Sequence, residues 1–293
     1  MYKSLLVPID FSSPSRRALD VATHLVDPGE GTIHVLTVLD RNLLRGPDAD
    51  KTIGAAQEAL EKKVAALADL YPRLAGRIDG RVDVDVPWHA ILRASEKGHD
   101  AVVMGTSARK GIDRWVLGSV AERVARLCRV PVVVSPPKRK AGPIEKILLA
   151  TDFSKASSPA AAHAIEVAAA MGAALTVLTV SPDLVAAVDF EVTLSLYRRQ
   201  LAAMKKESSQ KLKAFAAKHK ADVPKLSSLA RVGVPADTIV TVAGEIEADL
   251  VVVGTHGESG FFSAILGSVA RSVLRKAPCP VMVVKPVDFK SAV

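Results

Sequence analysis

The stretch L-V-V-V-G-T-H-G-E-S-G-F-F-S-A-I-L-G-S runs from Leu250 to Ser268, and it predicts the local fold. Its apolar start, L-V-V-V, is typical of a parallel strand buried on both faces. The loop that follows holds three glycines, Gly254, Gly257 and Gly260. Gly267 and Ser268 then open V-A-R-S-V-L-R-K, whose apolar residues recur at helical spacing. The stretch is therefore expected to form a strand, a glycine-rich loop and a helix.

A unit of this kind suits an anion. The first N–H groups of a helix have no intrahelical partner, and the helix dipole is positive at that end. Glycines before the helix let a phosphate approach the backbone without a Cβ in the way. A glycine-rich turn that binds nothing is the alternative. The spacing G-x2-G-x9-G-S is more specific than loose glycines, and it matches neither the Walker pattern nor G-x-G-x-x-G.

The chain repeats itself. The segment L-L-V-P-I-D-F-S, from Leu5 to Ser12, recurs as I-L-L-A-T-D-F-S from Ile147 to Ser154. Each half then has V-L-T-V, later V-V-M-G-T or V-V-V-G-T, then L-G-S-V-A, and finally P-V-V-V or P-V-M-V-V. The sequence therefore predicts two copies of one domain.

Within each copy, short apolar runs alternate with helical patterns, which favours βαβ units and a parallel sheet. Strands are expected near residues 4–9, 32–38, 81–86, 101–104 and 131–134, and near 146–150, 174–180, 226–232, 249–253 and 280–284. Helices are expected near 14–26, 50–70, 88–97 and 118–128, and near 157–171, 189–219, 235–246 and 267–276. The 189–219 helix, rich in Lys and Arg, is interpreted as an exposed amphipathic helix rather than a membrane-surface helix.

The predicted domains are residues 1–137 and 145–293. They are joined by a linker at 138–144, within the Pro- and Gly-rich stretch S-P-P-K-R-K-A-G-P. The predicted fold class is α/β and Rossmann-like, with two similar open-twisted parallel five-stranded sheets and helices on both faces. The pattern alone does not fix the strand order.

In every motif position, the Leu250–Ser268 stretch resembles the ATP-binding signature of the universal stress protein family, and the resemblance covers nearly the whole chain as a tandem of two such domains. It implies the strand order 3-2-1-4-5, with a ligand crevice between the ends of the first and fourth strands. It also implies a stress-response protein that binds ATP, with or without Mg²⁺. The implied ATP contacts of the second domain are Thr151, Asp152, Val180, Gly254, His256, Gly257, Gly267, Ser268 and Val269.

In the family, the aspartate that corresponds to Asp152 lies at the adenine side of the site. The valine that corresponds to Val180 lines the base and ribose pocket. An aspartate at a strand end before a helix also suits a cap, and this alternative stays open. His256 is equally well an exposed loop histidine.

The first copy departs from the signature, since Ala108 stands where the second glycine belongs. If that position needs a positive φ, a Cβ there costs about 1–2 kcal/mol. The first copy also has Asp85 where the second has Gly233. We therefore expect the first site to be weaker or empty. Its implied contacts are Ile9, Asp10, Val38, Gly105, Arg109, Gly118, Ser119 and Val120.

Composition narrows the function classes. Hydrophobic residues make up 49% and charged residues 24% of 293 residues, which is typical of a soluble globular protein. The net charge of +8 would favour polyanions if it were clustered, but its one tight run, Lys138 to Lys140, lies in the linker. Aromatic residues are only 4%, so nucleic acid binding is not expected.

Cys128 and Cys279 stand far apart and are interpreted as core thiols of a cytosolic protein. The start of the chain has no signal-peptide layout, and no apolar stretch is long enough to span a bilayer. We therefore expect a cytoplasmic protein with no membrane association.

No catalytic or metal-binding motif is recognisable, so at most slow ATP hydrolysis is expected. The resemblance implies an internal pseudo-dimer through Val132–Val134 and Val281–Val284, a possible homodimer and an unknown protein partner. Two alternatives remain: a scaffold of the same fold that holds a lipid or a metal, and a slow ATPase.

Overall fold

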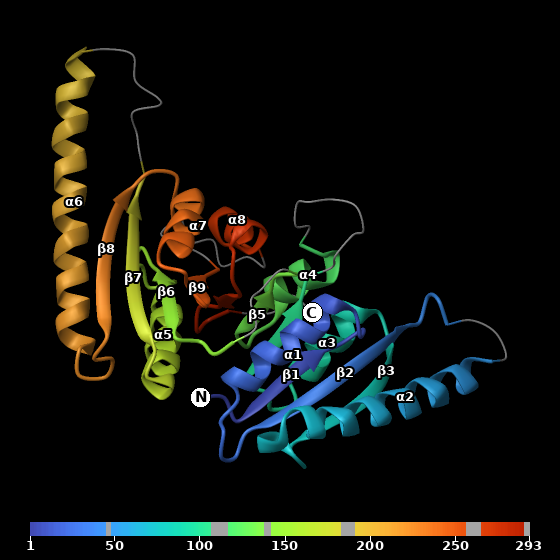
Figure 1. The fold of residues 1–293 in the computed structure, drawn as a ribbon. Helices are drawn as coiled ribbons and strands as arrows, with labels where there is room; N and C mark the ends of the chain where they lie inside the picture. The colour runs from blue at the N-terminus through green and yellow to red at the C-terminus, as the bar shows by residue number, and fades with distance from the viewer. Residues whose placement is uncertain (45–47, 107–116, 138–141, 183–190, 256–264, 290–293) are drawn as a thin grey trace. The chain divides into compact units, whose positions relative to one another are not determined.

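The computed structural model describes residues 1–44, 48–106, 117–137, 142–182, 191–255 and 265–289. It divides into two compact units, one built mainly from residues 1–143 and the other mainly from residues 144–287. Each unit is considered by itself, and Figure 1 shows the order of elements in both.

The first unit alternates strands and helices along the chain. Its elements are β1 (Ser4–Pro8), α1 (Ser13–Leu25), β2 (Thr32–Asp40), α2 (Ala49–Leu70), the 3-10 helix η1 (Pro72–Leu74), β3 (Ile78–Asp85), α3 (Pro87–Ser95), β4 (Ala101–Gly105), α4 (Ser119–Leu127) and β5 (Val132–Ser135).

The second unit repeats this order. Its elements are β6 (Lys146–Ala150), α5 (Ser158–Met171), β7 (Ala174–Ser181), α6 (Glu191–His219), β8 (Leu226–Val232), α7 (Pro235–Glu245), β9 (Leu250–Gly254), α8 (Ser268–Lys276) and β10 (Val281–Val284). Most elements begin and end within two residues of the expected positions, but β3 begins at residue 78 rather than near 81.

The strand order is β3-β2-β1-β4-β5 in the first unit and β8-β7-β6-β9-β10 in the second, and neighbouring strands within each unit run parallel. This confirms the order 3-2-1-4-5 in both copies. The strand order of the whole chain is that of a single ten-stranded sheet, which corrects the expectation of two separate sheets.

Burial follows the place of each strand in its unit. The central strand β9 is buried from Leu250 to Val253, whereas the outer strand β8 alternates between half-buried and exposed residues. The long helices α2 and α6 pack on the outer strands β3 and β8, as Figure 1 shows. Among the described residues, no helix is both long and apolar enough to cross a bilayer.

Gly105, at the end of β4, allows a close contact with the start of α1. A Cβ at this position would lie 2.6 Å from the carbonyl carbon and oxygen of Pro14 and 2.9 Å from the nitrogen of Ser15. These are backbone atoms, so they cannot move aside without shifting the helix. This glycine, predicted as an ATP contact, therefore has a packing role in the first unit.

We expect Gly105→Ala to lower the free energy of unfolding of the first unit by about 1–3 kcal/mol, because the added methyl overpacks the contact between β4 and α1. Both tryptophans of the chain, Trp88 and Trp115, belong to the first half of the sequence. Urea unfolding followed by tryptophan fluorescence therefore reports on this unit.

Gly54→Ala in α2 is the matched control, since a Cβ there meets no atom within 4 Å. Alanine is the better helix former, so this change should leave the unit as stable or up to about 1 kcal/mol more stable. Equal midpoints for Gly105→Ala and the unmodified protein would contradict the close packing.

Candidate functional site

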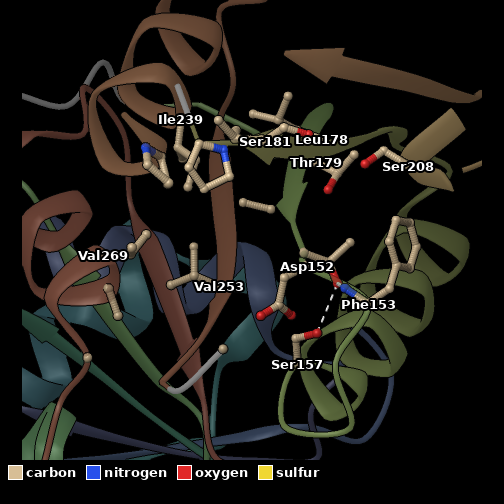
Figure 2. Close-up of a pocket in the computed structure, with 18 of the residues that line it drawn as sticks. Asp152, Phe153, Ser157, Leu178, Thr179, Ser181, Ser208, Ile239, Val253 and Val269 are labelled. Carbon is tan, nitrogen blue, oxygen red and sulfur yellow. Dashed lines mark hydrogen bonds between the residues drawn. The ribbon is translucent and has the colours of Figure 1, made fainter. Parts of the chain in front are cut away.

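A cavity of about 450 Å³ opens at the carboxyl ends of the strands of the second unit. It lies where the strand order reverses, between the ends of β6 and β9, which is where ligands bind in open parallel sheets. Figure 2 shows Asp152 and Thr179 between the Val269 side of the cavity and the Ser208 side. The predicted contacts that line the cavity are Thr151, Asp152, Val180, Gly254, Gly267, Ser268 and Val269.

The cavity thus gathers seven residues from four separate stretches of the sequence. His256 and Gly257, also predicted, lie outside the described residues. Contact of any of these residues with a ligand stays a prediction.

The first turn of α8 forms one wall. Gly267 is the N-cap of this helix, and Ser268, Val269 and Ala270 follow it along the cavity. The Gly267 N–H donates to the carbonyl oxygen of Thr255 at 2.9 Å, which ties the start of α8 to the end of β9. A Cβ on Gly267 would lie 2.7 Å from that same oxygen. The glycine is therefore needed for the helix to begin at the strand end, with its positive dipole end at the cavity.

The turn after β6 presents Asp152 and Phe153 to the cavity. Ser154 N–H donates to Asp152 Oδ1 at 3.0 Å, so the carboxylate supports the turn without capping α5, whose N-cap is Ser157. Phe153 N–H donates to Thr151 Oγ1 at 3.0 Å, and Phe153 has a φ of 60°. Non-glycine residues rarely adopt this left-handed conformation, which recurs at Phe11 in the first unit with a φ of 59°. Both units thus hold this phenylalanine in a costly backbone conformation.

Sequence reasoning missed the residues that α6 and α7 bring to the cavity. From α6 and α7, the lining includes Met204, Glu207, Ser208, Lys211, Pro235 and Ile239. The interpretation of α6 as simply an exposed amphipathic helix is therefore incomplete. Phe153 and Thr179 were also missed, although each adjoins a predicted residue. For Phe153 and Thr179, the sequence signal was their place next to motif residues. The α6 residues carried no such signal, because the sequence pattern of a helix does not show which of its residues reach a strand end.

Asp10 is the counterpart of Asp152 in the first unit. Its Oδ1 accepts hydrogen bonds from Ser12 N–H at 3.0 Å, Ser12 Oγ at 2.5 Å and Ser15 Oγ at 2.7 Å. Burial raises the pKa of this carboxyl, but the hydrogen bonds from Ser12 and Ser15 outweigh it and hold the pKa below its ordinary value. This carboxylate is held mainly by the turn that leads into α1.

The other predicted contacts of the first unit lie at equivalent places. Ile9 is buried after β1, Val38 is half-buried in β2, Gly118 is the N-cap of α4, and Ser119 and Val120 begin that helix. Thr151 Oγ1 lies 3.0 Å from Ser157 Oγ in the second unit. Ile9 stands at the position of Thr151 in the first unit, so that unit lacks this hydroxyl contact. Ala108 and Arg109 lie outside the described residues.

Comparison with known proteins decides the family. The sequence profile of the Universal stress protein family matches residues 1–136 and again 143–285. The chain belongs to the universal stress protein family. Its two matches, one after the other, show that it is a tandem universal stress protein.

Relatives support the same organisation. A universal stress protein of Mycolicibacterium smegmatis is 27% identical over 96% of this chain and 97% of its own length. One from Methanocaldococcus jannaschii is 38% identical over 144 residues, which is 48% of this chain and 82% of that protein. The crystal structure of a universal stress protein from Archaeoglobus fulgidus matches with a TM-score of 0.65 and 26% identity, and covers 97% of this chain and 98% of that one.

The two units of this universal stress protein differ at the end of the third strand. Gly233 has a φ of 151°, where side chains are disfavoured, and a Cβ there would lie 2.8 Å from Thr238 Oγ1. Asp85 occupies the same place in the first unit and is buried. Its carboxylate lies 2.8 Å from Arg41, 2.8 Å from His89 and 3.3 Å from Arg93. An ion network therefore stands in the first unit where the second has bare backbone.

We expect Asp85→Asn to lower the urea midpoint of the tryptophan transition at pH 7, because it removes the negative charge that pairs with Arg41 and Arg93. Burial raises the pKa of Asp85, but hydrogen bonds from His89 and Val86 and the charge of Arg41 lower it below the ordinary value of 3.8. The carboxylate therefore stabilises the fold above that ordinary pKa, and its contribution is lost as the pH falls through the folded pKa. The midpoint difference should be full at pH 7 and shrink below about pH 4.

Asp48→Asn is the control, since the Asp48 side chain is 76% exposed and lies 3.3 Å from the likewise exposed Lys51. Its effect should stay within about 0.5 kcal/mol at every pH. A midpoint difference for Asp85→Asn that persists unchanged at pH 3 would refute the charge-based account.

Proposed function

We propose that the second unit binds an adenine nucleotide, ATP in the first instance, in the cavity between β6 and β9. The observation that carries this proposal is the cavity itself, which gathers all the described residues of the second ATP motif. Its volume of about 450 Å³ falls within the range of small-molecule sites. Its lining combines apolar side chains with a few polar groups, as is typical of small-molecule sites.

The chemistry of the walls suggests how the nucleotide lies. The start of α8, with Gly267 and Ser268, offers N–H groups and a positive dipole end to the phosphates. Val180 and Ile239 offer apolar surface to the base and ribose, and Asp152 offers a carboxylate that accepts hydrogen bonds from a base amino group. We place the phosphates at α8 and the base toward Asp152 on these grounds.

In the first unit we propose weaker binding or none. Asp85 with its ion network replaces Gly233, and the Asp10 carboxylate already accepts three hydrogen bonds from the turn. These groups would have to rearrange before a ligand could use them.

The output of binding is proposed to be a conformational state or a partner interaction in a cytoplasmic stress response. The two halves are proposed to pair through β5 and β10, whose residues are all buried, and a homodimer is the further assembly to test.

Mg²⁺ would arrive with the phosphates, because no group of three metal-ligating side chains occurs among the described residues. The polar groups of the cavity make it less suited to a lipid than to a nucleotide.

Gly267→Ala is expected to raise the dissociation constant for ATP at least about tenfold, or about 1.4 kcal/mol, because the methyl pushes the start of α8 away from Thr255. Isothermal titration calorimetry on the full chain measures this. Gly244→Ala in α7 is the matched control, since a Cβ there meets no atom within 4 Å. It should bind ATP within about twofold of the unmodified protein. Equal affinities for both variants would refute the placement of the phosphates.

Hydrolysis is expected to be slow at most, because both carboxylates of the described lining already have partners: Asp152 accepts from Ser154 N–H, and Glu207 pairs with Lys211. In single-turnover mixing with Mg-ATP, product should form no faster than it does with Gly267→Ala. Rapid turnover that this substitution abolishes would instead establish an ATPase.

A further inference from the structure

A lysine recurs at one position of the repeat, on the long helix that follows the second strand. Lys63 of α2 and Lys211 of α6 each lie 15 residues before the first residue of the next strand, Ile78 and Leu226. Those two strand residues have equivalent partners in the register of β2 and β7. The two lysines are therefore counterparts, although their surroundings differ.

In the first unit, this lysine covers an aromatic ring. Lys63 Nζ lies 3.4 Å from the centroid of the Phe11 ring, in a cation–π contact. Phe11 follows Asp10 in the turn after β1. The residue one turn before Lys63, on the same side of α2, is Ala59, which has no group to hold an ammonium. One face of the Phe11 ring is thus occupied by a charged side chain.

In the second unit, the counterpart lysine is paired with a carboxylate. Lys211 Nζ lies 2.7 Å from Glu207 Oε1, and Glu207 stands at the position that Ala59 holds in the first unit. Phe153, the counterpart of Phe11, lines the cavity together with both of these residues. Its ring packs against Phe215 of α6, with centroids 6.0 Å apart and an angle of 60° between the planes. Figure 2 shows Phe153 and Ser208 of α6 on the same side of the cavity.

We propose that Glu207 holds Lys211 away from the Phe153 ring and so keeps a face of that ring open to the base of the bound nucleotide. This inference rests on the proposed function and names a positioning residue for it. Base rings stack on aromatic side chains regardless of base identity, because every base has a π face. An ammonium over Phe153, like that over Phe11, would have to be displaced before a base could stack there.

The fixed backbone of the turn supports this role. The left-handed φ of Phe153 and the hydrogen bond from its N–H to Thr151 Oγ1 set the direction in which the side chain leaves the chain. The contact with Phe215 occupies part of the ring from the α6 side. A ring held from the backbone and from one side is pre-organised for stacking, which lowers the entropy lost on binding.

The test is an ATP titration by isothermal calorimetry of four full-length proteins: the unmodified chain, Glu207→Ala, Lys211→Met and the double variant. Glu207→Ala recreates the first-unit arrangement, so its dissociation constant should rise about three- to tenfold as Lys211 moves onto the ring. Lys211→Met changes a residue of the cavity lining, so its affinity is the reference for the double variant. The double variant should bind as tightly as Lys211→Met and more tightly than Glu207→Ala, since no ammonium is left to cover Phe153.

Two controls sharpen the result. Lys213→Met removes a charge from an exposed position of α6 that does not line the cavity, and it should bind like the unmodified chain. In a Phe153→Leu background, which itself weakens binding, Glu207→Ala should have no further effect.

Three outcomes overturn the inference while leaving nucleotide binding intact. They are a Glu207→Ala affinity equal to that of the unmodified chain, a double variant as weak as Glu207→Ala, and a Lys211→Met variant weakened tenfold. The second would mean that the carboxylate itself contacts the ligand, and the third that the ammonium does. If the unmodified chain binds no ATP, the first titration shows that the proposed function fails and this inference with it.

Discussion

The parallel pairing of β6 with β9 is the contact on which the candidate site depends. Ile147 to Ala150 pair with Leu250 to Val253, so the two strands end at the same edge. The chain leaves β6 by way of α5 and leaves β9 toward α8, and the strand order turns in opposite directions from this pair. The diverging connections leave a space at the ends of these two strands, which residues of α6, α7 and α8 line. The cavity is therefore a product of topology, and the side chains decide what it can hold.

Comparison of the two repeated units distinguishes the effect of topology from the effect of the side chains. Both units have the same strand order, the same left-handed phenylalanine and an aspartate after the first strand. They differ in a few side chains at the strand ends: isoleucine or threonine at positions 9 and 151, aspartate or glycine at 85 and 233. Each change in the first unit adds an apolar or charged group where the second has a hydroxyl or bare backbone. The same fold thus gives two strand-end surfaces of different chemistry, within a family that the sequence alone identifies.

The sequence predicted the strands and helices well because buried parallel strands read as unbroken apolar runs. It misplaced the start of β3, since Ile78, Asp79 and Gly80 alternate in exposure at an outer strand and carry little apolar signal. The pattern alone predicted a five-stranded sheet in each half, and only the resemblance to the family implied that the last strands of the two halves pair.

For the site, motif spacing located the glycines and the aspartate, but it could not distinguish their roles. Gly105 carries the same motif position as Gly254, yet its close contact with Pro14 gives it a packing reason to be glycine. The contributions of Ser208 and Lys211 depend on which face of α6 meets the strand ends. That is a tertiary fact, visible only once the helix is packed.

The central claim is that the second unit holds one adenine nucleotide. The most direct measurement is to denature the freshly purified protein, then identify and count the released nucleotides by chromatography and mass spectrometry. The account predicts about one adenine nucleotide per chain, because it proposes ATP binding in the second unit and weaker binding or none in the first. Release of none, together with no binding when ATP is later titrated into the purified protein, would contradict it.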